Sequence, residues 1–320
     1  MPRVRIVHTT EYRYGQGVRF TPHRLMLRPR DSHDLRLLSA TLGLLPPLPQ
    51  TRWAHDVFAN SVCRLDWGAA RADCLRIVST LELEHFPAAD RVTSDALDPS
   101  AAFYPFRYSA DEFPDLARLM ERHHPDPSGR LDAWARRFIP QSGPESGCAG
   151  TLDLLVAMTE AIKHDFTYEA REAEGTNPPL HTLETGRGTC RDFALLMMEA
   201  ARALGFAARF VSGYLYDAAL ADSHTPMVGG GATHAWVSIY LPGAGWVEFD
   251  PTNGLVAGRN LIRVCVARTP EQAVPVAGGF IGRKTDFLGM TVDVSVTVGD
   301  APKAAPSAEP VVAEDTLSAA

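Results

Sequence analysis

Cys190 stands where a helix is expected to begin, and this makes it the first candidate for chemistry. It follows the turn signal Gly186-Arg-Gly188, and Thr189 lies three residues before Asp192, which is the spacing of a capping box. The first turn of a helix has unpaired N–H groups and the positive end of the helix dipole, so it favours an anion such as a thiolate. The ordinary alternative is a small cysteine buried in the core.

A nucleophilic thiol needs a base, and the base needs a group that orients it. His234 opens an expected strand over 233–241, and Asp250 closes a second strand over 245–250. If the hairpin pairs about residue 243, residue 236 faces 250, and His234 lies diagonally across from Asp250 on the same face. A slip of one residue would put the two side chains on opposite faces. Taken separately, His234 could be a buried strand histidine and Asp250 the start of a turn, so the hypothesis depends on their joint occurrence with Cys190.

Length and composition describe an ordinary globular protein of about two domains. The chain has 320 residues, of which 45% are hydrophobic, enough for a sizeable core. Its 31 Lys and Arg against 38 Asp and Glu give a net charge of −7, which argues against binding to nucleic acid or anionic membranes. Five cysteines are too few for a disulfide framework, and neither a signal peptide nor a transmembrane segment is recognisable. We therefore expect a cytoplasmic protein, and its oligomeric state stays open.

Residues 1–98 are expected to form an N-terminal β-rich domain. Leu75, Ile77, Ser79, Leu81 and Leu83 alternate with polar residues, and turn signals separate several other short extended stretches. This spacing is typical of a small sandwich. Residues 99–150 are expected to form a linking helical segment, with short helices over 111–123 and 131–138.

Residues 151–298 are expected to form the catalytic core. A helix begins at Thr151, a long polar loop covers 166–189, and a second helix begins at 190 and ends at Gly205. Strands are expected over 206–216, 233–241, 245–250, 261–266 and 285–298. Loops as long as 166–189 are usually functional or disordered. Residues 299–320, rich in Ala, Pro, Ser and Glu, are expected to be a disordered tail.

Four segments carry a resemblance to a known family. They are 182–194 (Thr-Leu-Glu-Thr-Gly-Arg-Gly-Thr-Cys-Arg-Asp-Phe-Ala), 210–215 (Phe-Val-Ser-Gly-Tyr-Leu), 233–237 (Thr-His-Ala-Trp-Val) and 245–254 (Gly-Trp-Val-Glu-Phe-Asp-Pro-Thr-Asn-Gly). They resemble the core motifs of the bacterial transglutaminase-like superfamily, and the first hundred residues resemble the N-terminal domain commonly joined to that core. The resemblance covers nearly the whole chain except the tail.

The resemblance implies an α+β protein: a β-sandwich-like N-terminal domain, then a papain-like core in which the catalytic helix packs on an antiparallel sheet. It identifies Cys190 with the nucleophile, His234 with the general base and acid, and Asp250 with the residue that orients the imidazole. One departure is Thr189, where the family often has Val. No calcium-site pattern of the animal transglutaminases is visible, so we expect no metal and no cofactor.

The expected chemistry is thiol-dependent acyl transfer on a peptide or protein amide, with hydrolysis preferred. Glutamine transamidation and a non-catalytic peptide-binding protein of the same fold are the alternatives, because the motif fixes the chemistry better than the substrate. The oxyanion is expected to bind the N–H of Cys190 and one other donor. Tyr168 and Trp236 are candidates for that donor, although both could be packing residues.

The remaining candidates have simpler interpretations. Asp192 is expected to stabilise the helix start, and Arg191 to face solvent or form a salt bridge, with contact to substrate as the alternative for both. The pair His123-His124 is interpreted as loop rather than metal site. The glycines 229–231 are expected to give mobility to a loop beside His234. The other cysteines are expected to be ordinary thiols: Cys63, Cys74, Cys148 and Cys265.

Overall fold

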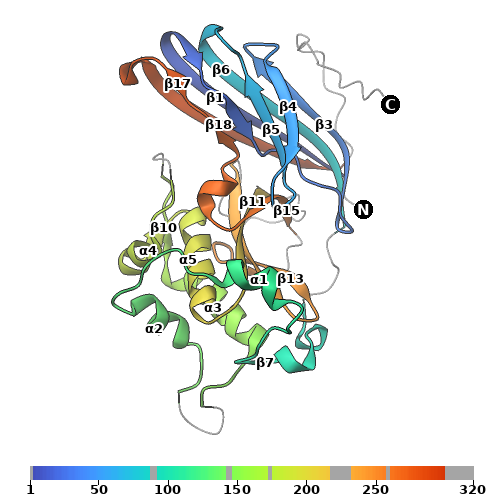
Figure 1. The fold of residues 1–320 in the computed structure, drawn as a ribbon, viewed down its shortest axis with the longest axis vertical. Helices are drawn as coiled ribbons and strands as arrows, with labels where there is room; N and C mark the ends of the chain where they lie inside the picture. Colours follow the sequence, from blue (N-terminus) through green and yellow to red (C-terminus); the bar gives the residue numbers. More distant parts are fainter. Residues whose placement is uncertain are drawn as a thin grey trace. The chain divides into compact units, whose positions relative to one another are not determined.

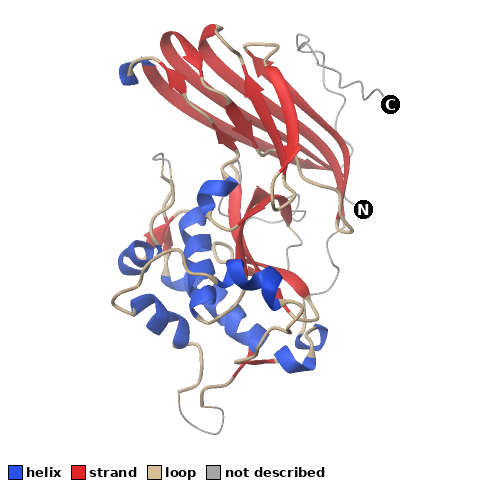
Figure 2. Cartoon of the chain, viewed as in Figure 1, coloured by secondary structure: helices blue, strands red, loops and turns tan. Residues whose placement is uncertain are grey.

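The computed structural model describes residues 3–86, 92–141, 146–171, 175–216, 232–256 and 260–299, and these divide into two compact units. The first unit contains residues 3–86, 232–233 and the described residues from 274 onward. The second contains the other described residues, up to 216 and from 234 to 273. Figures 1 and 2 show that the first unit consists almost entirely of strands, whereas the second combines a sheet with the α-helices.

The first unit is a sandwich of two antiparallel sheets, as expected from the sequence. One sheet has the order β17-β1-β6-β3, with β18 also paired to β1, and the other has the order β16-β2-β5-β4. The strands of the first sheet are β1 (Arg3–Phe20), β3 (Leu35–Leu45), β6 (Arg71–His85), β17 (Phe280–Ile281) and β18 (Phe287–Val298). Those of the second are β2 (His23–Leu25), β4 (Gln50–His55), β5 (Ser61–Asp66) and β16 (Val276–Ala277).

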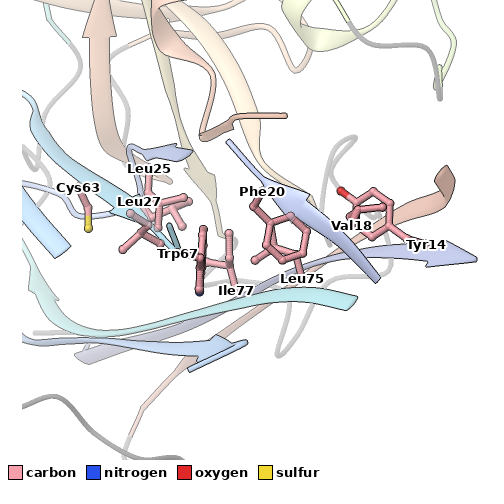
Figure 3. Close-up of a cluster of buried hydrophobic side chains, with 10 residues drawn as sticks. Tyr14, Val18, Phe20, Leu25, Leu27, Cys63, Trp67, Leu75 and Ile77 are labelled. Atoms are coloured by element: carbon pink, nitrogen blue, oxygen red, sulfur yellow. The ribbon is translucent and has the colours of Figure 1, made fainter. Parts of the chain in front are cut away.

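Strand alternation explains how the sandwich forms. The apolar positions of β6 that alternate in the sequence are the ones that are buried, and Leu75, Ile77 and Leu83 are all 0% exposed. Figure 3 shows a core cluster in which Phe20 and Leu75 of one sheet meet side chains of the other. The members of this cluster are Tyr14, Val18, Phe20, Leu25, Leu27, Cys63, Leu65, Trp67, Leu75 and Ile77.

The expected domain boundaries were wrong at both ends of the core. Strand β18 pairs with β1 from Val4↔Val298 to Tyr14↔Phe287, so residues from 274 onward belong to the sandwich. The described residues of 99–150, the segment expected to be a linker, are part of the second unit, as are residues 92–98. An alternating pattern identifies a strand but not its partner, and this partner lies almost 300 residues away. Of the tail expected over 299–320, residues 300–320 lie outside the described residues.

The second unit is built on a five-stranded antiparallel sheet with the order β14-β13-β12-β11-β15. Its strands are β11 (Ala208–Leu215), β12 (His234–Leu241), β13 (Gly245–Asp250), β14 (Leu255–Val256) and β15 (Leu261–Ala267). The helices are α1 (Phe113–Met120), α2 (Arg130–Arg136), α3 (Thr151–Asp165), α4 (Pro179–Thr185) and α5 (Cys190–Ala203). Helix α5 packs on β11 and β12, so the expected helix-on-sheet core is confirmed. None of the described helices is long and apolar enough to cross a membrane.

The stretch 166–189, expected to be a loop, contains regular structure. Strand β9 (Thr167–Tyr168) pairs in parallel with β10 (Arg187–Gly188), and α4 lies between them. Pro179 starts α4, and Gly186 ends it in the left-handed conformation with φ of 64°. Proline is a usual signal for the start of a helix, and glycine just past the last helical residue is a usual signal for its end. So short a helix has too few apolar residues to show a periodic pattern. Elsewhere β7 (Phe103–Tyr104) pairs with β8 (Ala149–Gly150).

A buried ion pair fixes the far part of α5. Glu199 and Arg202 are both 0% exposed at their side chains, with Oε1 and Nη1 2.8 Å apart. Arg202 also donates to carbonyls of other elements, and Glu199 accepts from the backbone N–H groups of His123 and His124. The pair therefore connects the helix to segments distant in the sequence.

Removing one partner of this pair should destabilise the second unit strongly. We expect Glu199→Ala to lower the free energy of unfolding by about 3–5 kcal/mol, because the Arg202 charge stays buried without its partner. The matched control is Glu184→Ala, whose pair with Arg130 is about half exposed at both side chains and should cost less than about 1 kcal/mol. Urea unfolding measures both, and similar losses in the two variants would contradict the expectation.

Candidate active site

Cys190 is the first residue of α5, and the expected capping box is present. The Thr189 hydroxyl accepts from the backbone N–H of Asp192, and the Asp192 carboxylate accepts from the backbone N–H of Thr189, at 3.4 and 2.8 Å. Cys190 is 7% exposed. A thiolate there lies among the unpaired N–H groups of the first turn, which stabilise negative charge.

The glycine before this turn has a steric cause. A Cβ added to Gly188 would come within 2.8 Å of the Asp192 Cβ and 3.2 Å of the Phe193 ring. The residue two positions before Cys190 must therefore lack a side chain for the capping carboxylate to fold back under the turn.

His234 and Asp250 lie on the same face of the β12–β13 hairpin. The observed register pairs Tyr240 with Trp246 and Val237 with Phe249, which is the expected register. Nε2 of His234 lies 2.8 Å from Oδ2 of Asp250, and both side chains are 0% exposed. The structure thus brings together the two residues whose meeting depended on an even register.

Asp250 is held by more than the imidazole. Its Oδ2 accepts from Nδ2 of Asn253 at 2.8 Å, and its Oδ1 accepts from the N–H of Thr252 at 3.0 Å. The carbonyl of Asn253 in turn accepts from Nζ of Lys163 on α3 at 2.7 Å. Burial by itself would raise the pKa of Asp250, but the charge of His234 and these hydrogen bonds hold it below its usual value. The contact of Asn253 with Asp250 could have been predicted from the sequence, because Asn253 directly follows the turn residues Asp-Pro-Thr. No local pattern indicates the contact of Lys163 with this turn.

The buried pair strongly favours the protonated imidazole. Burial lowers the pKa of His234, but the charge of Asp250, the hydrogen bond to Asp250 and the neighbouring Cys190 thiol outweigh burial and raise the pKa to about 10. Because Nε2 is taken by Asp250, Nδ1 is the ring nitrogen left for Cys190. Among the described residues Nδ1 has no partner at ordinary hydrogen-bond geometry. The three expected residues therefore adjoin one another in the order Cys190, His234, Asp250.

Trp236 supports the imidazole from one side. Its ring is 0% exposed and stacks on His234 with centroids 6.0 Å apart and planes 27° apart. A Cβ on Gly213 of β11 would come within 2.8 Å of the Trp236 ring and 2.1 Å of the carbonyl oxygen of Ile262. The glycine of Phe-Val-Ser-Gly-Tyr-Leu is therefore the residue that leaves room for this stack.

Tyr168 lies near Cys190. It belongs to β9 and pairs with Gly188, two residues before Cys190. Partial burial and the nearby Cys190 raise the pKa of its hydroxyl. Its side chain is partly exposed, at 36%, whereas Trp236 is fully enclosed.

Arg191 has a different environment from the expected one. Its Nη2 donates to the carbonyl of Pro270 at 2.7 Å, and its guanidinium carbon lies 4.9 Å from the centre of the Phe210 ring. No ion pair of Arg191 occurs among the described residues, so the expectation of solvent or a salt bridge was wrong. Its partners are backbone carbonyls of η3 (Pro270–Ala273) and the hydroxyl of Thr176. Local sequence gives no sign that η3 packs against the helix start.

The remaining candidates do not join the site. None of the five cysteines, all of which lie in the described part of the chain, forms a disulfide; Cys63 and Cys265 are buried, and Cys74 and Cys148 are half-buried. The described part of the chain contains no cluster of three or more His, Cys, Asp or Glu side chains suited to a metal ion. The glycines 229–231 lie outside the described residues.

Comparison with known proteins places this site in a family. Residues 141–251 match the transglutaminase-like superfamily model, and residues 4–84 match the bacterial transglutaminase-like N-terminal region. Together the two matched regions cover more than half of the chain. The chain therefore belongs to the transglutaminase-like superfamily and carries the bacterial N-terminal region of that family.

Relatives similar over most of the chain include two mycobacterial proteins. An uncharacterized protein of Mycobacterium leprae is 25% identical over 299 residues, 92% of this chain and 99% of the relative. One of Mycobacterium tuberculosis is 27% identical over 313 residues, 93% of this chain and 94% of the relative. A candidate cysteine protease from Cytophaga hutchinsonii has a crystal structure that matches with a TM-score of 0.65 at 16% identity, covering 97% of this chain and 95% of that one. This structure shows that the fold is shared.

The buried pair should make stability depend on pH in a defined direction. The pKa of His234 is raised, so its contribution is complete below the ordinary value of 6.5 and is lost as the pH rises towards about 10. The pKa of Asp250 is lowered, so its contribution is present above the ordinary value of 3.8 and is lost below it.

We therefore expect Asp250→Asn to lower the free energy of unfolding most between about pH 4 and 6.5, with a deficit that shrinks as the pH approaches 10. Urea unfolding of both proteins at pH 5.5, 7.5 and 9.5 measures this difference. A deficit that stays constant over this range would show that the pair is not charged in the folded chain.

Proposed function

We propose that the chain is a cysteine peptidase or amidase that hydrolyses a peptide or protein amide through Cys190, His234 and Asp250. One observation carries the proposal: the fully buried hydrogen bond between His234 and Asp250 lies beside a cysteine at a helix start. A buried carboxylate that holds an imidazole in one orientation is the arrangement needed to activate a thiol. Membership of the superfamily supports thiol chemistry. We further propose that water, rather than an amine, accepts the acyl group.

The reaction divides into two acyl transfers. The Cys190 thiolate forms a bond to the amide carbonyl carbon, and the electron pair of the C=O bond moves to oxygen. When the C–N bond breaks, the imidazolium of His234 gives its proton to the leaving amine, and a thioester remains. Neutral His234 then takes a proton from water, and the resulting hydroxide adds to the thioester carbonyl. The carboxylic product leaves, and the thiolate and imidazolium are restored.

Two donors are proposed for the oxyanion. One is the backbone N–H of Cys190, which is unpaired in the first turn of α5. For the second we favour the hydroxyl of Tyr168 over the indole of Trp236, because Tyr168 is partly exposed beside the thiol whereas Trp236 is enclosed against His234.

The surroundings of the enzyme are also part of the proposal. We place it in the cytoplasm, where thiols stay reduced, and this agrees with five cysteines that form no disulfide. The partner is a peptide or protein amide rather than nucleic acid or a membrane, in line with the net charge of −7.

The nucleophile is tested by Cys190→Ala, which should lower the rate of amide cleavage at least about a thousandfold while the fold is kept. A peptide library, read by mass spectrometry with and without a labelled primary amine, measures the products. Cleaved peptides with little incorporated label support hydrolysis. Amine-dependent labelling would instead identify a transamidase, and unchanged products from wild type and Cys190→Ala would indicate a peptide-binding protein.

The second donor is tested by Tyr168→Phe, which should lower kcat by about 10²- to 10³-fold because an uncompensated oxyanion remains. The control is Tyr240→Phe, whose hydroxyl donates to Glu112 at 2.8 Å and not to the thiol. Equal kcat values for Tyr168→Phe and wild type would remove Tyr168 from the mechanism.

A further inference from the structure

Asp192 is a second buried carboxylate in the active site, and the mechanism above gives it no role. Its side chain is 0% exposed, and it lies in the first turn of α5, two residues after the nucleophile. As a capping residue it requires only the N–H of Thr189. The structure gives it three further donors, namely the Thr189 hydroxyl, the N–H of Asn177 and the guanidinium of Arg171.

Arg171 meets this carboxylate with both ends of its guanidinium. Nη1 lies 2.8 Å from Oδ2, and Nη2 lies 3.2 Å from Oδ1. The Arg171 side chain is 25% exposed, whereas the Asp192 carboxylate that it contacts has no exposure to water. Such a two-point pair is stronger and more specific in geometry than a single contact.

A buried negative charge at this place works against the nucleophile. The start of α5 favours a thiolate because its N–H groups and helix dipole are positive, and a carboxylate in the same turn cancels part of that potential. Burial alone would raise the pKa of Asp192, but the hydrogen bonds from Arg171, Thr189 and Asn177 hold it below its usual value. Asp192 is therefore charged at neutral pH, and its charge must be compensated.

We propose that Arg171 is a positioning residue that neutralises Asp192, so that the capped start of α5 stays favourable to the thiolate of Cys190. The inference rests on the proposed role of Cys190 as nucleophile. Asp192 supplies the geometry of the first turn, and Arg171 removes the electrostatic disadvantage of placing an acid there.

Other charged groups near the thiol do not replace Arg171. Arg191 interacts electrostatically with Cys190, Glu271 of η3 and Asp192. Its donors, however, bind the carbonyls of η3 and the Thr176 hydroxyl, and it forms no ion pair with Asp192 among the described residues. The imidazolium of His234 is paired with Asp250. Among the described residues, the titratable and charged groups near Cys190 are Tyr168 of β9, His234 of β12 with Asp250 of β13 behind it, and Arg191 and Asp192 of α5, with Arg171 paired to Asp192.

A purely structural role for Arg171 makes a different prediction. Nη2 of Arg171 also donates to the carbonyl of Gly175 at 3.1 Å, so the residue holds two parts of the segment before α4 together. If it only fastens this segment, every substitution should reduce activity alike, and the protonation of the thiol should not change. If it acts as a counter-charge, variants that keep the charge should differ from variants that lose it.

The experiment measures alkylation of Cys190 by iodoacetamide as a function of pH, with the Cys190 peptide quantified by mass spectrometry to separate it from the other four thiols. We expect Arg171→Gln to move the midpoint of alkylation upward by about one pH unit, which is about a tenfold slower reaction below the midpoint. Arg171→Lys should keep most of the wild-type midpoint. In Arg171→Gln/Asp192→Asn both charges are gone, and the midpoint should return towards that of wild type.

The matched control is Arg187→Gln, an arginine of β10 whose pair with Glu169 is more than half exposed at both side chains. Water and salt screen this pair, so its loss should leave the midpoint unchanged. Thermal unfolding of every variant establishes that the fold is kept.

Equal midpoints for wild type and Arg171→Gln, or a double variant shifted as far as Arg171→Gln alone, would overturn the counter-charge role. A wild-type Cys190 that reacts no faster than a free thiol at neutral pH would overturn the proposed function, and this inference with it. Alkylation needs no substrate, so the two failures are distinguishable.

Discussion

The hydrogen bond between His234 and Asp250 is the interaction on which the rest of the second unit depends. An imidazole and a carboxylate without contact to water are costly to bury, and they are tolerated because each satisfies the other. The pair forms only if β12 and β13 meet in the observed register, since a one-residue slip would separate them. The ring of Trp236 and the turn after Asp250 then fix the imidazole plane and the remaining carboxylate oxygen.

The site contains two buried carboxylates that are compensated in different ways. Asp250 is balanced by His234, which transfers protons in the proposed mechanism, whereas Asp192 is balanced by the guanidinium of Arg171, which has no part in that transfer. The difference matters chemically. In the proposed mechanism the carboxylate of Asp250 stabilises His234 while His234 exchanges protons. The charge of Arg171 offsets that of Asp192 at the start of α5 throughout the reaction.

What could be predicted from the sequence was the part of the structure set by neighbours along the chain. The capping box depends on Thr189 and Asp192, three residues apart, and the hairpin register depends on the short turn between β12 and β13. Both predictions are confirmed. The long-range partners could not be predicted in this way. Lys163 behind the Asp250 turn and Arg171 beside Asp192 are single polar residues with no pattern around them, so only the folded chain shows which carbonyl or carboxylate they meet.

Strand β18 was expected in the core but belongs to the sheet of the first unit, and this pairing constrains how the chain folds. Strand β1 pairs with β18 as well as with β6, so the sheet of the first unit contains strands from near both ends of the described chain. Contacts as distant as Val4↔Val298 carry a high loop-closure cost until the intervening chain is compact. The second unit has its helix and hairpin contacts within a shorter span, so it can fold first and shorten the effective distance between the two strands. The second unit is an insertion in the chain between the two parts of the first unit, and its folding shortens the loop that must close before β1 and β18 pair.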